Sequence, residues 1–195
     1  MDTIKIAVTG GIGSGKSSVT KIIREKGFSV FFCDEINKQL LTNKDYINRI
    51  EKIFPEAVEG GKIIKSRLAE IVFSDETALK KLNSVSHPLI MNELNRQMNS
   101  RKGLVFAEVP LLFEGGYENL FHKIIVVCRE KEQRILSVMQ RDHSDREAVL
   151  SRISRQYDYS QPIPGSVIFL NNDSTISELE NKVVDLLNEF CKEYL

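Results

Sequence analysis

The chain reads GGIGSGKSS from residue 10 to residue 18, immediately after the apolar run of residues 4–9. Glycine loses more backbone freedom on folding than any other residue, so four glycines within six positions weaken both helix and strand. The spacing from Gly10 to Gly15, Lys16 and Ser17 fits the phosphate-binding pattern G-x-x-x-x-G-K-[ST]. We predict that the bare backbone of this loop holds the phosphates of a nucleotide.

The residues on either side of the loop support this interpretation. Residues 4–9 are apolar enough for a short buried strand, and Val19, Ile22 and Ile23 follow at the spacing of one helix face. Gly27 stands where that helix would end. The alternative is a glycine-rich turn before an ordinary helix. The succession of strand, loop and helix is the context that a phosphate loop requires, and it favours nucleotide binding.

The motif also assigns roles within the loop. Backbone N–H groups and the positive end of the helix dipole would surround the phosphates. Lys16 would reach the β- and γ-phosphates, and the hydroxyl of Ser17 would be a ligand of Mg²⁺. The predicted nucleotide-binding residues are Gly11, Ile12, Gly13, Ser14, Gly15, Lys16, Ser17 and Ser18.

Length, charge and cysteine content narrow the class of protein. A chain of 195 residues can bury a sizeable core as one domain with insertions. The 27 basic and 27 acidic residues balance, so no overall charge favours nucleic acid. The three cysteines are far apart and lack metal-ligand spacing, which is typical of a reducing compartment. With no signal peptide and no apolar run of membrane-spanning length, we expect a soluble, cytoplasmic protein.

Five short apolar segments read as strands separated by helical patterns, at residues 4–9, 28–33, 104–109, 123–128 and 167–170. They are almost continuously apolar, as in a parallel sheet covered on both faces. The predicted fold is therefore α/β. A closing helix is predicted from the capping box of Thr175 and Glu178 and from an apolar stripe formed by Ile176, Leu179, Val183, Leu186, Leu187 and Phe190.

Two stretches do not fit a minimal alternating sheet. Residues 35–101 read mainly as helices and form a long insertion that could hold a second substrate over the nucleotide. Residues 140–164 read as a helical hairpin, and six of the eleven arginines fall between residues 129 and 155. These arginines could close over phosphates and exclude water, or they could form a solvated charged surface. The charge pattern alone does not separate the two alternatives.

Among phosphate-loop proteins, the chain best fits a small-molecule kinase. A GTPase would need a guanine-reading Asn-Lys-x-Asp, which is absent, and a motor ATPase is usually much longer. Asp34 follows the second predicted strand, where it could accept a hydroxyl proton, hold the metal through water or cap a helix. Glu108 ends the third predicted strand and is the second candidate for a carboxylate that binds the metal. Glu114 could contact the acceptor or cap a turn.

The phosphate loop and four later blocks together resemble the dephospho-coenzyme A kinases. The blocks are Ile71-Val72-Phe73-Ser74-Asp75, Ser86-His87-Pro88-Leu89-Ile90, Val109-Pro110-Leu111-Leu112-Phe113-Glu114, and Gln140-Arg141-Asp142 with Arg152 and Gln156. They occur in the order found in the family and extend over essentially the whole chain. The second and third blocks are specific to that family, whereas the phosphate loop is shared more widely.

The resemblance implies a three-layer P-loop kinase fold in a single domain. Its core would comprise residues 1–34, 102–139 and 165–195, with a helical acceptor-binding insertion at 35–101 and a lid at 140–164. The implied reaction is transfer of the γ-phosphoryl of ATP, with Mg²⁺, to the ribose 3′-hydroxyl of dephospho-coenzyme A. This reaction is the last step of coenzyme A synthesis.

The resemblance also implies residue roles. Asp34 matches the catalytic base, Arg141 matches the lid arginine that meets the ATP phosphates, and Lys16 completes the catalytic set. The residues implied to bind the acceptor are His87, Pro88, Leu111 and Glu114. His87 also fits a purely structural role in hydrogen bonding.

Two departures from the family pattern leave questions open. Phe32 replaces the first acid of the usual Asp-Ala-Asp, so Asp34 is the only acid in this block. The usual Asn-Gly after the last strand is Asn171-Asn172, and either residue is a candidate for contact with adenine. A nucleoside or nucleotide kinase and a nucleotide-binding switch protein are the alternative functions. The acceptor is a small molecule, and neither nucleic acid nor a membrane is expected as a partner.

Overall fold

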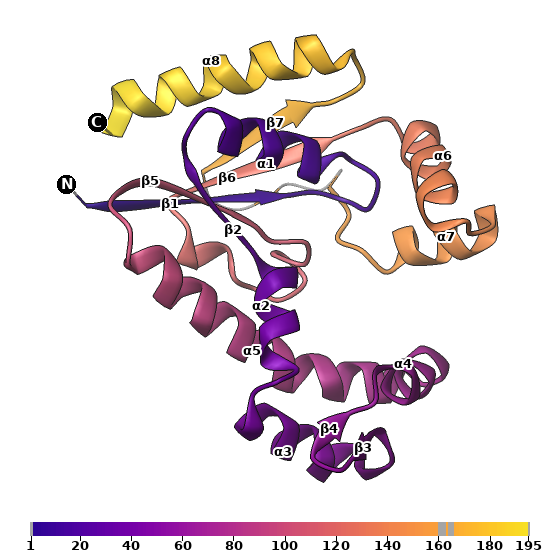
Figure 1. The fold of residues 1–195 in the computed structure, drawn as a ribbon. Coiled ribbons are helices and arrows are strands. Elements are labelled where there is room, and N and C mark those ends of the chain that lie inside the picture. The colour runs from indigo at the N-terminus through magenta and orange to yellow at the C-terminus, as the bar shows by residue number, and fades with distance from the viewer. Residues whose placement is uncertain (1, 160–162, 164–165, 195) are drawn as a thin grey trace. The chain divides into compact units, whose positions relative to one another are not determined.

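The computed structural model describes residues 2–159, 163 and 166–194. Figure 1 shows a sheet of five strands flanked by helices. The strands are β1 (Thr3–Thr9), β2 (Ser29–Phe32), β5 (Gly103–Glu108), β6 (Lys123–Cys128) and β7 (Val167–Asn171). Their order across the sheet is β2-β5-β1-β6-β7. The phosphate loop thus follows the central strand, and the chain crosses to both sides of it, the arrangement in which α/β proteins bind ligands.

Parallel pairing on both sides explains the apolar sequence of β1. Ile6 lies opposite Phe106 of β5 and opposite Lys123 of β6. Ile6, Ala7 and Val8 are completely buried, because helices cover both faces of the strand. The prediction of a five-stranded parallel sheet is confirmed. Cys33, which was expected to end the second strand, instead begins a helix.

One face of the sheet carries the main core. It packs against α1 (Lys16–Glu25) and α8 (Ile176–Tyr194), and Phe106 contacts the rings of both Phe28 and Phe190. The predicted capping box forms: the Glu178 N–H donates to Thr175 Oγ1, and the Thr175 N–H donates to Glu178 Oε2. The predicted apolar stripe was wrong at its first member, since Ile176 is 66% exposed. Ile176 lies in the first turn, one turn before the buried face begins at Leu179.

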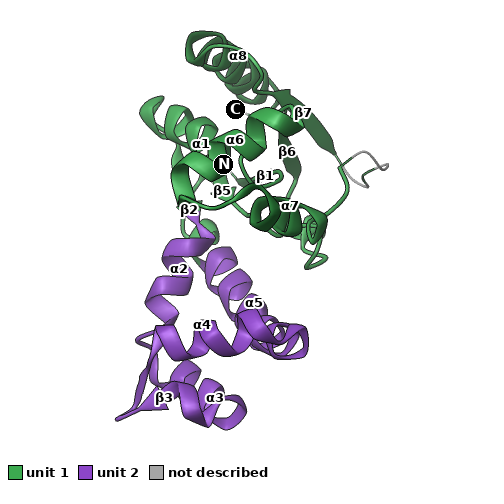
Figure 2. Cartoon of the chain, turned by 90° about the vertical axis from the view of Figure 1, so that its right-hand side faces the viewer, with its two compact units in different colours: residues 1–31, 97–195 green, residues 32–96 purple. Residues whose placement is uncertain are grey.

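Residues 32–96 form a second compact unit, coloured purple in Figure 2. Its elements are α2 (Cys33–Leu40), α3 (Lys44–Ile53), η1 (Pro55–Ala57), β3 (Val58–Glu59), β4 (Lys62–Ile63), α4 (Lys65–Ser74) and α5 (Glu76–Asn99). The last residues of α5 belong to the first unit. The sequence pattern predicts helices here but does not indicate the hairpin of β3 and β4. The turn is Gly60-Gly61, both with positive φ, which is a recognised hairpin signal.

The second unit has its own core. Helix α3 contributes Tyr46 and Ile50, which pack with Leu68 and Val72 of α4. The hydroxyl groups of Tyr46 and Ser86 are 2.8 Å apart and share a hydrogen bond, and burial raises the pKa of Tyr46. This separate core supports the description of residues 32–96 as a folding unit of their own.

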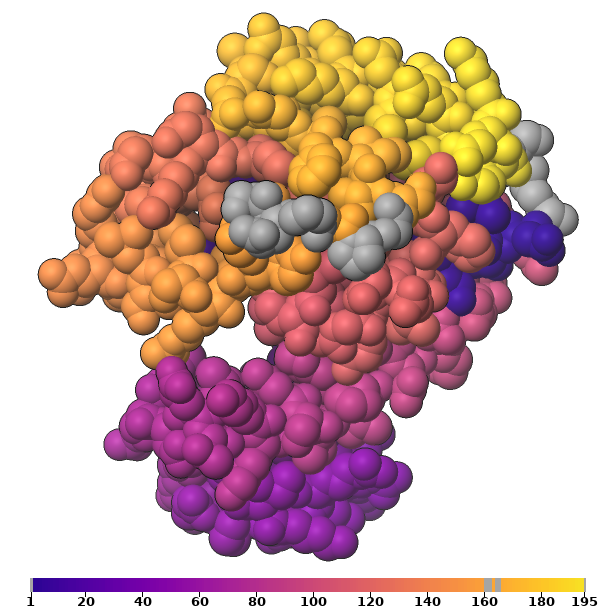
Figure 3. All heavy atoms as spheres, turned by 180° about the vertical axis from the view of Figure 1, so that it is seen from behind, coloured from indigo at the N-terminus to yellow at the C-terminus, as the bar shows by residue number. Residues whose placement is uncertain are grey.

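The arginine-rich stretch forms two helices, α6 (Lys131–Asp142) and α7 (Arg146–Ser154), after the short η2 (Glu118–Leu120) and β6. Ile135 and Val138 of α6 pack on Val149 of α7. Figure 3 shows the two helices as one continuous salmon and orange surface. The predicted hairpin was right in type, but its first helix begins at Lys131 rather than near Gln140. Residues 160–162 and 164, in the predicted range 140–164, lie outside the described residues.

None of the helices that the structure describes combines the length and the apolar character needed to cross a membrane.

Candidate active site

The phosphate loop turns sharply between β1 and α1. Gly10, Gly13 and Gly15 have φ values of 140°, 76° and 93°, a region that residues with a Cβ rarely adopt. Gly15 is the residue before α1, so the loop leads directly into the N-terminus of that helix, which is the positive end of its dipole. The loop therefore offers the backbone donors and the helix dipole that favour an anion.

The glycines are also required by close packing. A Cβ at Gly13 would lie 2.6 Å from the carbonyl oxygen of Arg134, and a Cβ at Gly15 would clash with the side-chain amide of Asn172. The loop is thus enclosed by α6 on one side and by the residues after β7 on another.

Three distant side chains hold the loop in this conformation. The Ile12 N–H donates to Gln156 Oε1 over 2.7 Å, and the Ile12 carbonyl oxygen accepts from Arg134 Nε over 2.9 Å. Asn172 Nδ2 donates to the Ser14 carbonyl oxygen over 2.8 Å. Burial lowers the pKa of Arg134. The bracing role of these residues is not predictable from the sequence, because no local pattern indicates their partners.

A pocket of about 200 Å³ lies beside the loop. It brings together six candidate site residues and three others, namely Gly13, Gly15, Lys16, Ser17, Glu108 and Arg141, with Arg129, Ser137 and Val138. Three of these side chains carry a positive charge and one carries a negative charge. A small, open and mainly cationic pocket at a helix N-terminus suits a polyphosphate.

Lys16 projects over its own loop. Its ammonium group donates to the carbonyl oxygens of Gly10, over 2.8 Å, and Gly11, over 3.2 Å. These contacts hold the charge at the pocket, where the motif requires a lysine for the outer phosphates.

Glu108 and Ser17 could serve a magnesium ion. Thr20, which is buried in α1, donates its hydroxyl hydrogen to Glu108 Oε2 over 2.8 Å and so fixes that carboxylate at the pocket. The described residues contain no cluster of three His, Cys, Asp or Glu side chains suited to a metal. Mg²⁺ usually takes one or two protein oxygens and completes its shell with phosphates and water. The hydroxyl of Ser17 and the carboxylate of Glu108 fit that requirement.

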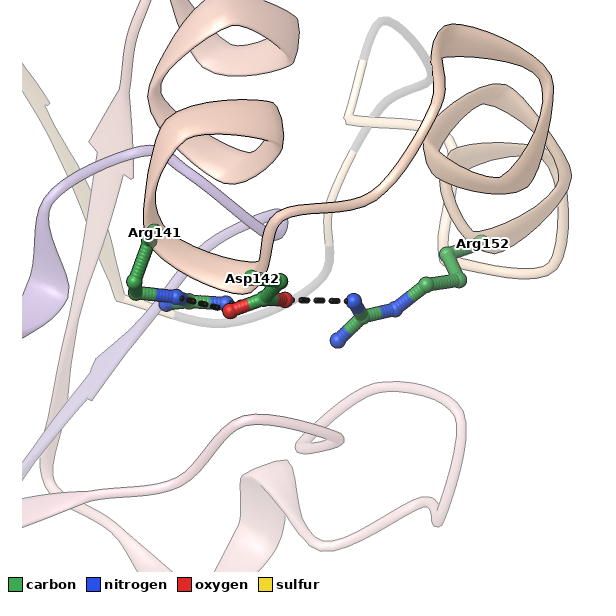
Figure 4. A network of polar contacts seen from close by, with 3 residues as sticks. All are labelled: Arg141, Asp142 and Arg152. Carbon is green, nitrogen blue, oxygen red and sulfur yellow. Dashed lines mark hydrogen bonds and ion pairs between the residues drawn. The ribbon is translucent and has the colours of Figure 1, made fainter.

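The arginines divide between the two alternatives that their sequence pattern left open. Arg129 and Arg141 line the pocket, and Arg134 braces the loop. Arg146 forms a bidentate pair with Glu132, with N···O distances of 2.8 and 2.7 Å. Arg152 donates to Asp142, as does Arg141 (Figure 4). Part of the set therefore belongs to the site and part links α6 to α7.

Asp34 is the second residue of α2, in the unit of residues 32–96. Phe32 is the N-cap residue of that helix, so the interpretation of Asp34 as the cap was wrong. The Asp34 side chain is exposed and makes no hydrogen bond to the described residues. His87 and Pro88 lie inside α5 of the same unit, where His87 is half-buried and Pro88 is exposed.

Glu114 and Leu111 belong to the turn after β5, in the other unit. Glu114 Oε1 accepts from the Tyr157 N–H over 2.8 Å, and the ring of Phe113 stacks on Tyr157 and contacts Tyr159 edge-on. Burial and the nearby carboxylate of Glu114 raise the pKa of Tyr159 to about 12. These contacts tie the segment after α7 to the turn that carries Glu114.

Asn171 and Asn172 have different surroundings. Asn171 is exposed at the end of β7, and its side-chain oxygen accepts from the Asp173 N–H. Asn172 is half-buried, with its side chain on the phosphate loop and its N–H donating to the Cys128 carbonyl oxygen. The structure thus gives Asn172 a bracing role and leaves the side chain of Asn171 more accessible.

Comparisons with known proteins agree on one family. The family model described as dephospho-CoA kinase matches residues 4–178. A dephospho-CoA kinase from Thermus thermophilus is 37% identical over 190 residues, covering 95% of this chain and 91% of that protein. One from Fusobacterium nucleatum is 34% identical over 197 residues, covering 98% of this chain and 99% of that protein.

Solved structures give the same result. The protein TT1252 from Thermus thermophilus superposes with a TM-score of 0.80 at 34% identity, covering 97% of this chain and 98% of that one. A dephospho-CoA kinase from Campylobacter jejuni superposes with a TM-score of 0.73 at 30% identity, covering 99% of both chains. Several further kinases, at 12–16% identity and TM-scores near 0.5, share the fold alone. The chain belongs to the dephospho-CoA kinase family.

Proposed function

We propose that the pocket beside Lys16 binds the phosphates of ATP while the γ-phosphoryl group passes to the ribose 3′-hydroxyl of dephospho-coenzyme A. The reaction is inferred from membership of the family, and the roles of the residues are inferred from the pocket that they line. Phosphoryl transfer depends mainly on positioning and on neutralising charge at the transferring group. Lys16, Arg141 and the N-terminus of α1 supply that charge within one pocket.

In this proposal Ser17 and Glu108 hold Mg²⁺, which supplies charge neutralisation between the β- and γ-phosphates when it is bound. Thr20 keeps Glu108 turned to the pocket. Arg134, Gln156 and Asn172 keep the loop open for the nucleotide. Asn171 remains the more accessible candidate for contact with adenine.

Asp34 is the proposed base. It follows the carboxyl end of β2, and the phosphate loop follows the carboxyl end of β1 in the same parallel sheet. Ligands of such sheets gather at the carboxyl ends of the strands. The ribose hydroxyl is a poor nucleophile, so an ionised carboxylate must accept its proton as the new bond forms.

Residues 35–101, with His87 and Pro88, are proposed to bind the acceptor, together with Leu111 and Glu114 from the turn after β5. Residues 140–164 are proposed to act as a lid, since exclusion of water favours transfer to the acceptor. A cytoplasmic location remains a prediction.

The test is acceptor-dependent ADP production from ATP, measured with dephospho-coenzyme A and with a panel of nucleosides and nucleotides. Lys16→Ala should reduce turnover at least about a thousandfold, because the charge at the transferring phosphoryl is lost. The matched control is Lys21→Ala, an exposed lysine of the same helix that pairs with Glu25.

Lys21→Ala should keep turnover near wild type. Wild-type turnover in a folded Lys16→Ala protein would contradict the assignment of this loop as the phosphate-binding site. ADP production that does not depend on an acceptor would instead favour a switch protein, and a preference for nucleosides would favour the alternative kinase class.

A further inference from the structure

Asp142 sits between two arginines at the end of α6. It accepts from Arg141 Nε over 2.7 Å and Nη2 over 3.1 Å, and from Arg152 Nη1 over 2.7 Å. Figure 4 shows both guanidinium groups converging on this one carboxylate, Arg141 from α6 and Arg152 from α7. These charge-assisted bonds hold the pKa of Asp142 well below its usual range, so the group is ionised at every physiological pH.

A carboxylate at this position is unfavourable for nucleotide binding when only charge is considered. Arg141 lines the pocket with Lys16 and Ser17, and the proposed ligand is a polyanion. A negative charge that partly neutralises Arg141 weakens attraction for phosphates. The carboxylate must therefore be explained by another effect.

Orientation of Arg141 provides that effect. Its side chain is 61% exposed, and a long exposed arginine samples many rotamers. The two bonds from Nε and Nη2 fix the plane of the guanidinium, as bidentate pairs do. The Nη1 group is not used in these bonds and remains available to a phosphate oxygen.

We propose that Asp142 is a positioning residue that orients the Arg141 guanidinium for the transferring phosphoryl group. The inference rests on the proposed function, because it assigns Arg141 to the reaction. Asp142 touches no substrate in this proposal and acts through Arg141 alone. The negative charge of Asp142 weakens the attraction between Arg141 and the phosphates in the ground state. Because Asp142 already orients the Arg141 side chain, that side chain loses less freedom in the transition state, and this smaller loss offsets the weaker attraction.

The same pair of helices provides a matched control. Glu132 of α6 forms a bidentate pair with Arg146 of α7, and both side chains are about half exposed. Neither residue lines the pocket. The two carboxylates therefore make similar links between α6 and α7, and only Asp142 is joined to a pocket residue.

The experiment compares Asp142→Asn with Glu132→Gln for turnover and for ATP affinity by calorimetry. Asp142→Asn should lower kcat by about tenfold or more, the scale of a mispositioned catalytic group. Its Kd for ATP should stay the same or fall, because a negative charge near the phosphates is removed. Asp142→Glu should recover part of the turnover. Glu132→Gln should leave both values within about twofold of wild type.

A double-mutant cycle with Arg141→Met separates positioning from stabilisation of the helices. Asp142→Asn should add less than about a twofold loss in the Arg141→Met background, because its effect passes through Arg141. The proposal is overturned if Asp142→Asn behaves like Glu132→Gln, if it weakens ATP binding in step with turnover, or if its effect persists without Arg141. If Arg141→Met itself keeps wild-type turnover, the assigned role of Arg141 has failed instead.

Discussion

At the scale of single residues, the two candidate carboxylates have different surroundings. Glu108 is fixed at the pocket by the hydroxyl of Thr20 and lies beside Ser17, as a metal-side group should. Asp34 is exposed in the first turn of α2, and its side chain has no hydrogen-bonding partner among the described residues. A base must pass its proton to water after the reaction, and the exposed side chain of Asp34, our proposed base, is open to solvent.

Asp34→Asn should lower turnover by roughly a hundredfold or more, the usual scale of general-base catalysis. ATP affinity and melting temperature should change little, because Phe32 and not Asp34 is the cap of α2. The loss of one charge from the first helical turn costs only about 0.3–1 kcal/mol. Turnover, ATP affinity and melting temperature are measured on one preparation.

Glu35→Gln is the control for that variant, since Glu35 is exposed in the same first turn and loses the same interaction with the helix dipole. It should keep turnover within about twofold of wild type, as surface changes usually do. If Asp34→Asn and Glu35→Gln give equal turnover, the base is Glu108 or no residue of the chain.

At the scale of elements, the phosphate loop depends on parts of the chain far from it in sequence. Both backbone groups of Ile12 are paired, one with Arg134 of α6 and one with Gln156 after α7. Asn172, after β7, holds Ser14. The loop conformation is thus shared among three elements, and a change in any of them should reach the nucleotide site.

Gln156→Ala leaves the Ile12 N–H without its partner and should weaken ATP binding about five- to tenfold. This is the lower end of the roughly 1–3 kcal/mol range for an unpaired buried donor, because Ile12 is only half-buried. Calorimetry gives the affinity, and thermal unfolding gives the stability. Gln140→Ala, at an exposed position of α6, is the control and should alter neither value. A fall in melting temperature with unchanged ATP affinity would mean that Gln156 stabilises the chain without shaping the loop.

Distance along the chain decides which of these features could be predicted from the sequence. The strand, loop and helix of residues 4–27 are local, so periodicity and glycine spacing were sufficient to predict them. The loop braces were not predictable, because Gln156 is 144 positions from Ile12 and Asn172 is 158 positions from Ser14. The hairpin at Gly60-Gly61 was missed although its turn signal is local. Each of its strands is only two residues long, too short for an alternating pattern.

At the scale of the whole molecule, two units with separate cores are joined through β2 and α5. The core around the sheet contains large buried side chains such as Phe106 and Phe190, and it extends over β1, β5 and α8. The core of residues 32–96 is smaller and is built mainly on Tyr46, Ile50, Phe54 and Leu68. Stability in such chains is distributed in cooperative units, and the smaller core should open first.

Native-state hydrogen exchange should therefore show a lower opening free energy for amides of α3 and β4 than for amides of β1. Amides of α8, which packs on the sheet core, should follow β1 and serve as the internal control. Increasing denaturant should open α3 and β4 first, with a smaller slope than global unfolding. One common opening energy for all four elements would show that the two units unfold as one.

The aromatic residues give the molecule an optical property. The chain has five tyrosines and no tryptophan, so tyrosine dominates its ultraviolet emission. The rings of Tyr157 and Tyr159 both contact Phe113, and Gln156 of the same segment bonds to the phosphate loop. We expect a nucleotide that shifts the loop to change the environment of these two rings as well. Intrinsic tyrosine fluorescence, with Tyr157→Phe and Tyr159→Phe to assign it, would then follow ligand binding in the unlabelled protein.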